Sequence, residues 1–114
     1  MASSFSAARA RAAAPLFAAL GDPTRLALVA RLSRGGPESI GNLSEGAGVS
    51  RQAVAKHLRV LSDAGLVRGA RDGRRRVFRL LPRRLADARG HLERIDAQWD
   101  EALSRLKDFV EEGD

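Results

Sequence analysis

A short group of side chains at the start of one predicted helix has the chemistry to read the edges of DNA bases. Arg51 can donate two hydrogen bonds to a guanine, Gln52 can pair in the same bidentate way with an adenine, and the Ala53 methyl group can touch a thymine methyl. Lys56 lies one helical turn further on and suits either a base or a phosphate. Ser50 precedes the helix, where a serine serves as N-cap and can also donate to a phosphate.

A second cluster of basic side chains surrounds a predicted hairpin tip. The pair Asp72-Gly73 favours a type I′ turn between two short strands. Strand alternation sends the neighbouring arginines to both faces, so not all of them can touch the same DNA. We expect Arg74 and Arg76 to contact phosphates or a narrow minor groove, with Arg71 behind them. The alternative is a hairpin whose charges only keep it solvated.

The chain has two histidines, His57 and His91, and neither has an obvious catalytic partner. His57 can bond a phosphate at the groove edge or pack against the turn between two helices, and the sequence leaves both open. His91 has Asp87, Glu93 and Asp96 nearby, which is a weak zinc signal that a solvated charged face explains better. Cys and Tyr are absent, and no nucleophile–base pair or phosphate-binding loop appears. We therefore expect neither enzymatic activity nor a cofactor.

Four helices and a hairpin must position these side chains. Helices are expected at residues 6–20, 23–34, 40–47 and 51–64, with Asp22, Ser39 and Ser50 as N-caps and Gly65 as the stop of the fourth. Pro15 predicts that the first helix forms two pieces or a kink. The fourth helix, which follows the third after a glycine-containing turn, completes a helix-turn-helix. The expected inward side chains are Leu16, Phe17, Leu20, Leu26, Val29, Ala30, Leu32, Ile40, Leu43, Val54, Leu58 and Leu61.

Charge is segregated along the chain. Residues 51–89 carry 12 basic and 3 acidic groups, a net +9, whereas residues 90–114 carry 3 basic and 8 acidic groups, a net −5. Residues 1–50 contribute +2, and the total is +6. A polyanion should therefore meet the middle of the chain and be repelled by its C-terminal end. A solvated charged surface is the alternative, although it does not explain the clustering.

The last expected helix, residues 82–112, has an apolar seam with heptad spacing. Such a helix is roughly 45 Å long, which exceeds a small helical core, so much of the seam needs a partner. The simplest partner is a second copy of the chain, although the helix could fold back in part on its own core. The seam residues expected to hold a dimer are Leu85, Leu92, Ile95, Trp99, Leu103 and Leu106.

Several segments together resemble the ArsR/SmtB family of bacterial transcription regulators. Residues 17–26 (FAALGDPTRL) resemble its opening signature, and residues 49–61 (VSRQAVAKHLRVL) resemble its recognition helix. Residues 64–67 and 72–80 resemble its wing. The resemblance implies a homodimeric winged helix-turn-helix repressor of an operator with twofold symmetry.

The resemblance is to a cysteine-free branch of that family. Residues 98–106 (QWDEALSRL) are similar to the long, tryptophan-bearing final helix of this branch, whose ligand is often unknown. The family's familiar response to metals or metalloids uses cysteines in the third helix. Residues 40–46 (IGNLSEG) contain no thiol, so we expect no metal site.

These patterns predict a mainly α fold with a small β-hairpin, arranged as a dimeric winged helix-turn-helix. Residues 1–114 would form one domain, with a DNA-binding core at 15–81 and a dimerisation helix at 82–112. The expected partners are double-stranded DNA and a second copy, with no membrane and no identified effector. A cytoplasmic location follows, at the nucleoid when DNA is bound. A protein-interaction module and a nonspecific DNA binder are the alternatives.

Overall fold

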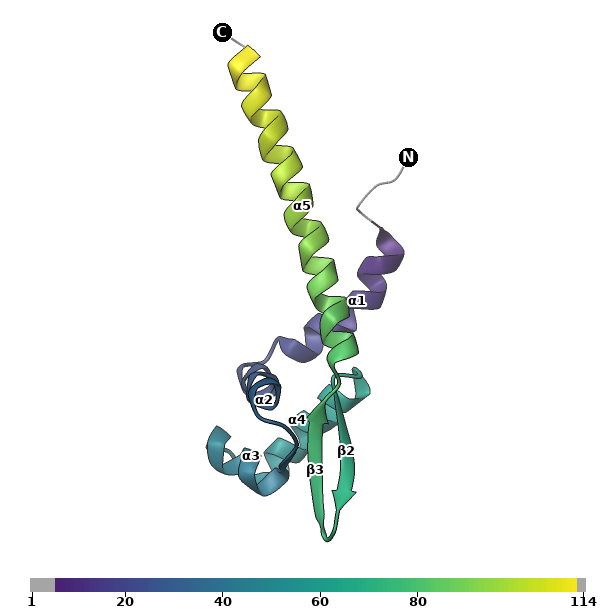
Figure 1. Ribbon diagram of the computed structural model, residues 1–114, viewed down its shortest axis with the longest axis vertical. Coiled ribbons are helices and arrows are strands. Elements are labelled where there is room, and N and C mark those ends of the chain that lie inside the picture. Colours follow the sequence, from purple (N-terminus) through teal and green to yellow (C-terminus); the bar gives the residue numbers. More distant parts are fainter. Residues whose placement is uncertain (1–5, 113–114) are drawn as a thin grey trace.

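The computed structural model describes residues 6–112, which form a small body and one long projecting helix (Figure 1). The molecule measures 70 × 28 × 20 Å, and α5 accounts for most of its length. None of the helices in this part of the chain is long and apolar enough to span a bilayer. The elements in chain order are α1 Ala7–Leu20, α2 Pro23–Arg34, β1 Glu38–Ser39, α3 Ile40–Ala47, α4 Arg51–Asp63, β2 Val67–Asp72, β3 Arg75–Leu80 and α5 Pro82–Glu112.

The predicted helix ends are confirmed. Asp22, Ser39 and Ser50 each accept a hydrogen bond from the backbone N–H three residues later, at 3.0 to 3.2 Å. Gly48 lies between α3 and α4 with φ at +68°, and Gly65 follows α4 with φ at +78°. Only glycine adopts this region without strain, so the two positions fix where each helix stops.

Pro15 lies inside α1, so of the two predicted outcomes, two separate helices or a kink, the first is wrong. The chain is helical from Ala7 to Leu20 despite the hydrogen bond that the proline cannot donate. Alanines on both sides favour the helix strongly, and Leu16 and Ala19 are buried in the core. The burial of Leu16 and Ala19 and the high helix propensity of the alanines therefore together offset the free-energy cost of the proline.

The sheet has three strands in the order β1-β3-β2, whereas only a hairpin was predicted. Strand β1 adds the pairs Glu38 with Phe78 and Ser39 with Val77. A strand of two residues has no periodicity to detect. It exists because the outer edge of β3 offers unpaired backbone groups to the segment just before α3.

The wing turn differs from the predicted type I′. Asp72 pairs with Arg75, which leaves Gly73 and Arg74 as the two central residues. Gly73 has φ at +66°, and no residue other than glycine has a positive φ in the described chain. A type I′ turn needs positive φ at both central residues, so the turn fits the II′ pattern, in which only the first is positive.

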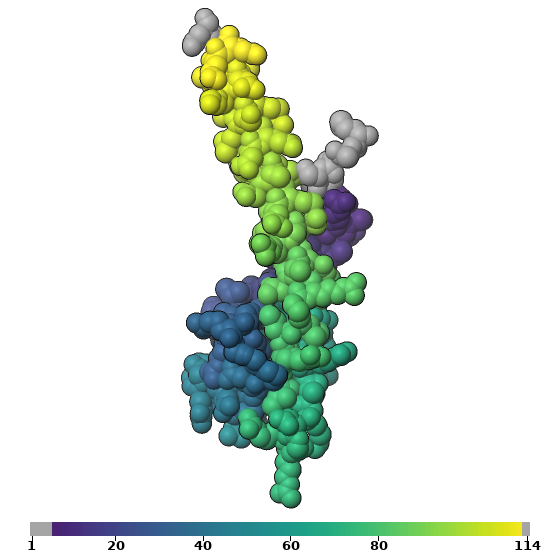
Figure 2. Space-filling view, viewed as in Figure 1, coloured from purple at the N-terminus to yellow at the C-terminus, as the bar shows by residue number. Residues whose placement is uncertain are grey.

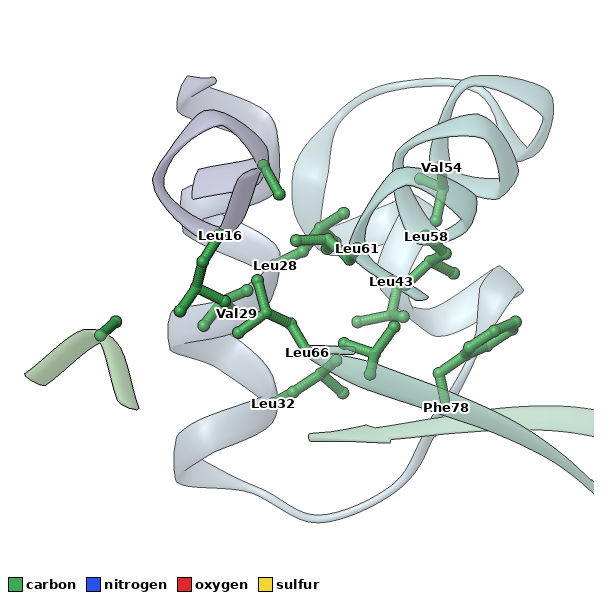
Figure 3. Close-up of a cluster of buried hydrophobic side chains, with 13 residues drawn as sticks. Leu16, Leu28, Val29, Leu32, Leu43, Val54, Leu58, Leu61, Leu66 and Phe78 are labelled. Atoms are coloured by element: carbon green, nitrogen blue, oxygen red, sulfur yellow. The ribbon is translucent and has the colours of Figure 1, made fainter. Parts of the chain in front are cut away.

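One apolar core joins α1 to α4 with the sheet (Figure 3). Val54, Leu58 and Leu61 of α4 are fully buried, as their spacing predicted. Leu66, just before β2, and Phe78 of β3 close the cluster on the side of the sheet (Figure 3). The buried members are Leu16, Ala19, Leu28, Val29, Leu32, Leu43, Val54, Leu58, Leu61, Leu66, Val67, Phe78 and Ala88.

The buried face of α2 is rotated from the prediction. Leu26 is 54% exposed and Ala30 is also exposed, whereas Leu28 is buried together with Val29 and Leu32. The three buried side chains fall within about 100° of helix surface, a normal width for a core-facing stripe. Leu26 and Ala30 lie outside that arc, so including them in the core was wrong.

Candidate nucleic-acid interface

The helix α4 is anchored by one face and presents the other to solvent. Its buried side holds it against α2 and α3, while Arg51, Gln52 and Lys56 are exposed and Ala53 is half-buried. Because residues three, four and seven apart share a helix face, Arg59 belongs to the same exposed surface as Gln52 and Lys56. Arg59 was missed by the sequence analysis, although its spacing from Gln52 was a usable signal.

A groove separates the start of α4 from the wing. Its volume is about 750 Å³, and residues of α3, α4 and the wing tip line it. The groove brings together Arg51 and Gln52 with the arginines at 74–76, which are far away in sequence. It also includes Ser39, which was expected only as an N-cap, and Asn42, which the sequence analysis did not single out. The wing tip, whose arginines line the groove, protrudes at the end of the molecule opposite the free end of α5 (Figure 2).

Arg71 and Arg76 are directly opposite each other in the wing. Cross-strand partners share a face of the sheet, so Arg71 lies beside Arg76 rather than behind it as expected. The guanidinium carbon of Arg76 is 5.3 Å from the centre of the Phe78 ring, which supports this side chain from below. Two like charges in opposite positions repel each other, and a bound anion would relieve that repulsion.

Arg51 leans against α3 in this structure. A Cβ atom placed on Gly41 would lie 3.1 Å from a terminal nitrogen of the Arg51 guanidinium. The close approach therefore depends on a residue without a side chain at position 41. Ser50, by contrast, acts as the N-cap of α4, with its hydroxyl accepting from the Ala53 backbone N–H at 3.1 Å.

His57 packs against the start of α2, the second of its two possible environments. Its Nδ1 accepts from Arg25 Nη1 at 3.3 Å and lies 3.9 Å from an Asp22 carboxylate oxygen. Arg25 also donates from Nε to the Ala19 carbonyl at 2.6 Å. The hydrogen bond from the Arg25 backbone N–H, and then the charge of the Arg25 guanidinium, hold the pKa of Asp22 below its ordinary value. This network joins the end of α1 to the recognition helix.

Comparison with known proteins assigns the chain to a family. It is 43% identical over 97 residues to the HTH-type transcriptional regulator Rv2034 of Mycobacterium tuberculosis, an alignment that covers 84% of this chain and 87% of the relative. The chain belongs to the ArsR/SmtB family of DNA-binding transcriptional regulators. The family described as "Helix-turn-helix domain" matches residues 20–70.

Solved structures of ArsR-family proteins have the same fold. An ArsR-like transcriptional regulator from Rhodococcus sp. RHA1 is 37% identical, covers 94% of this chain and 97% of its own, and superposes with a TM-score of 0.82. The antimony-specific transcriptional repressor AntR is 30% identical, covers 83% and 86% of the two chains, and gives a TM-score of 0.64. The mainly helical winged fold predicted from the sequence is therefore confirmed.

The metal sites known from ArsR/SmtB regulators do not fit the residues of this chain. Helix α3 offers no thiol, and residues 6–112 contain no cluster of three or more potential ligands. His91 lies with its ring centre 5.8 Å from that of Phe17, and Asp87 is paired with Arg84 at 3.1 Å. The donor set needed for zinc is thus not assembled at His91, and no metal-dependent step follows.

Proposed function

We propose that the chain is a homodimeric, sequence-specific repressor that binds an operator with twofold symmetry. The observation that carries the proposal is the groove in which the exposed start of α4 meets the arginine-rich wing tip. A helix fits the major groove of B-DNA, and a basic hairpin beside it fits the flanking backbone or minor groove. The proposed site of action is the cytoplasm, at the nucleoid when DNA is bound, and no enzymatic activity is part of the proposal.

The recognition helix would read bases through its first turn. Arg51 and Gln52 are exposed there, and their side chains suit guanine and adenine, respectively. Reading a base requires Arg51 to leave its position against Gly41. Lys56 and Arg59, further along the same face, suit phosphates. Ala53 at the edge of the buried face would offer its methyl group to thymine.

The remaining contacts would position the protein without reading sequence. Arg71, Arg74 and Arg76 of the wing suit the phosphate backbone or a narrow minor groove. Ser50 would cap α4 and aim its first turn at the groove. His57, whose ring nitrogen is bonded to Arg25, would act by fixing α4 against α2 rather than by a direct phosphate contact.

A second copy would cover the apolar face of α5. Leu92, Trp99, Leu103, Leu106 and Phe109 are all more than half exposed. The chain has 8289 Å² of accessible surface at 12.3 kDa, whereas a compact monomer of that mass exposes about 6,000 Å². Helix α5 contributes to this difference because its later turns extend beyond α1 and the body (Figure 1). Dimerisation through this face would place two recognition helices on successive turns of one DNA face.

A titration of labelled DNA tests the proposal. The probe is the region upstream of the chain's own gene, and the control is random DNA of equal length at the same salt concentration. We expect tighter binding to the upstream region and a steep loss of affinity with salt, because each phosphate contact releases counterions. Arg51→Ala should weaken specific binding, while Arg105→Ala on distant α5 should not.

The competing functions give different results. Equal affinity for both DNAs would make the chain a nonspecific DNA binder. If neither DNA binds while α5 still pairs with another protein, the exposed seam of α5 would make the chain an interaction module instead. Either result would refute the proposed operator-specific repressor.

A further inference from the structure

A cleft between α1 and α5 gathers positive charge away from the wing. It consists of two cavities, of about 280 and 140 Å³, and three basic side chains line both of them. These are Arg9 from α1 and His91 and Arg94 from α5. Figure 1 places this junction of α1 and α5 at the end of the body opposite the wing tip. The cluster is therefore remote from the surface that we assign to DNA.

Small residues on the two facing helices create the space. Ala12 and Ala13 of α1 and Gly90 of α5 line the larger cavity, and Ala10 lines the smaller one. Larger side chains at these positions would fill the space between the two helices. The helices therefore leave a hollow that both small apolar residues and basic side chains line. A lining that combines apolar residues with a few polar groups is typical of small-molecule sites.

The positive charge of the cleft is not compensated within the described part of the chain. Across residues 6–112, neither Arg9 nor Arg94 forms an ion pair. The one carboxylate that lines the cleft, Asp87, is held by Arg84 at 3.1 Å. Glu93, the acidic neighbour of Arg94 in sequence, is paired with Arg89 instead. Cations that converge without a partner raise the local concentration of anions.

We propose that this cleft binds a small organic anion, either a carboxylate or a phosphate monoester. Arg9 and Arg94 approach the cleft from different helices, so one anion can accept hydrogen bonds from both guanidinium groups. Arginine suits planar carboxylate and phosphate oxygens because it donates two parallel hydrogen bonds. His91 donates a third from its ring. The combined volume suits a ligand the size of a small metabolite rather than a peptide or a nucleic acid.

The cleft also has a physical connection to the apolar face of α5. The ring of His91 packs on Phe17, with 5.8 Å between the ring centres. Phe17 in turn lines the apolar groove that contains Leu92 and Trp99. An anion that draws His91 toward it therefore changes the packing of Phe17 beside the seam. An effect on DNA affinity rests on the proposed repressor function, whereas anion binding itself does not.

Calorimetric titration of the full chain, without DNA and in a buffer free of phosphate, tests the site. The probes are succinate, benzoate and glycerol 3-phosphate, which separate carboxylates from phosphate monoesters. We expect saturable binding of one class with one ligand per chain. Arg9→Gln and Arg94→Gln should each weaken it about tenfold or more, as loss of a hydrogen bond to a charged group does. Arg105→Gln, also on α5 but outside the cleft, should leave it unchanged.

Several outcomes would overturn the proposal. One is that no probe binds saturably, and another is that Arg105→Gln weakens binding as much as Arg94→Gln. Dissociation of a dimer by Arg94→Gln without any probe binding would mean that the cluster contacts the acidic helix end of a second copy. If Arg9→Gln or Arg94→Gln lowers DNA affinity as much as Arg51→Ala does, the basic residues of the cleft contact DNA instead of a small anion.

Folding of the variants is checked by circular dichroism. If a charge variant fails to fold, Ala10→Leu fills the smaller cavity while keeping all three basic groups. It should weaken probe binding by a similar factor, and unchanged binding in this variant would also count against the cleft.

Discussion

Trp99→Glu should break the proposed dimer. The side chain is 63% exposed on α5. A fully exposed tryptophan presents about 250 Å², so about 150 Å² is available to a partner. If half of that is covered, burial contributes about 2 kcal/mol per chain at 25 cal/mol per Å². Both chains of a symmetric dimer lose this burial free energy, about 4 kcal/mol in all, so the dimer Kd should rise about a thousandfold.

Sedimentation velocity over a range of concentrations measures the effect. Trp99 is the only tryptophan in the chain, so its fluorescence gives a second, local reading. In the wild type its emission should shift to shorter wavelength as the concentration rises and the ring leaves water. Ala97→Glu is the matched control, because it adds the same charge at an exposed position on the opposite side of α5.

Two results would refute this reasoning. If Trp99→Glu and Ala97→Glu give the same dimer Kd, the apolar seam does not hold the chains together. If a dimer sediments while the emission of Trp99 stays that of a ring in water, the chains associate through another surface. Either result would also remove the geometric basis for placing two recognition helices on one operator.

Three further predictions concern the recognition helix, the sheet and the wing. Gln52→Ala should cost about 1–3 kcal/mol on operator DNA and less on random DNA in fluorescence anisotropy, and equal losses would make it a backbone contact. Arg31 donates to Glu38 at 2.6 Å and lowers its pKa, so Glu38→Gln should destabilise the fold at neutral pH. In urea unfolding, the stability difference between the wild type and Glu38→Gln should vanish as the pH falls through the lowered pKa, because the wild-type carboxylate is then protonated and loses its charge. A difference that does not change with pH would contradict the ion pair. Gly73→Ala should cost about 1 kcal/mol because φ is +66° there, while Gly35→Ala at φ −112° should cost less in the same melts.

Local signals predicted much of this structure correctly. The N-caps, the stop at Gly65 and the buried stripe of α4 each depend on a few neighbouring residues, and all are confirmed. The full extent of α5 was also predicted from its uninterrupted heptad spacing. Such features are visible because backbone chemistry and helix periodicity act within one or two turns.

Features that depend on distant partners were not predicted. Strand β1 forms only because β3 supplies an edge, and α2 has enough apolar residues to allow more than one buried face. The bond from Arg25 to His57 joins residues 32 positions apart, so the sequence left the histidine's environment open. The position of Arg71 was predicted wrongly because it depends on the register of the two strands, which the turn fixes. The turn residues are Gly73 and Arg74, and this register pairs Arg71 with Arg76.

The charges of this chain are separated along a molecule 70 Å long, with the arginine-rich wing at one end and the acidic turns of α5 at the other. Such a molecule has a large permanent electric dipole and experiences a torque in the field of DNA. It should rotate during diffusion so that the wing faces the DNA on arrival, which reduces the number of collisions in the wrong orientation. The acidic end of α5 would thereby act on the rate of operator search rather than on the strength of the final complex.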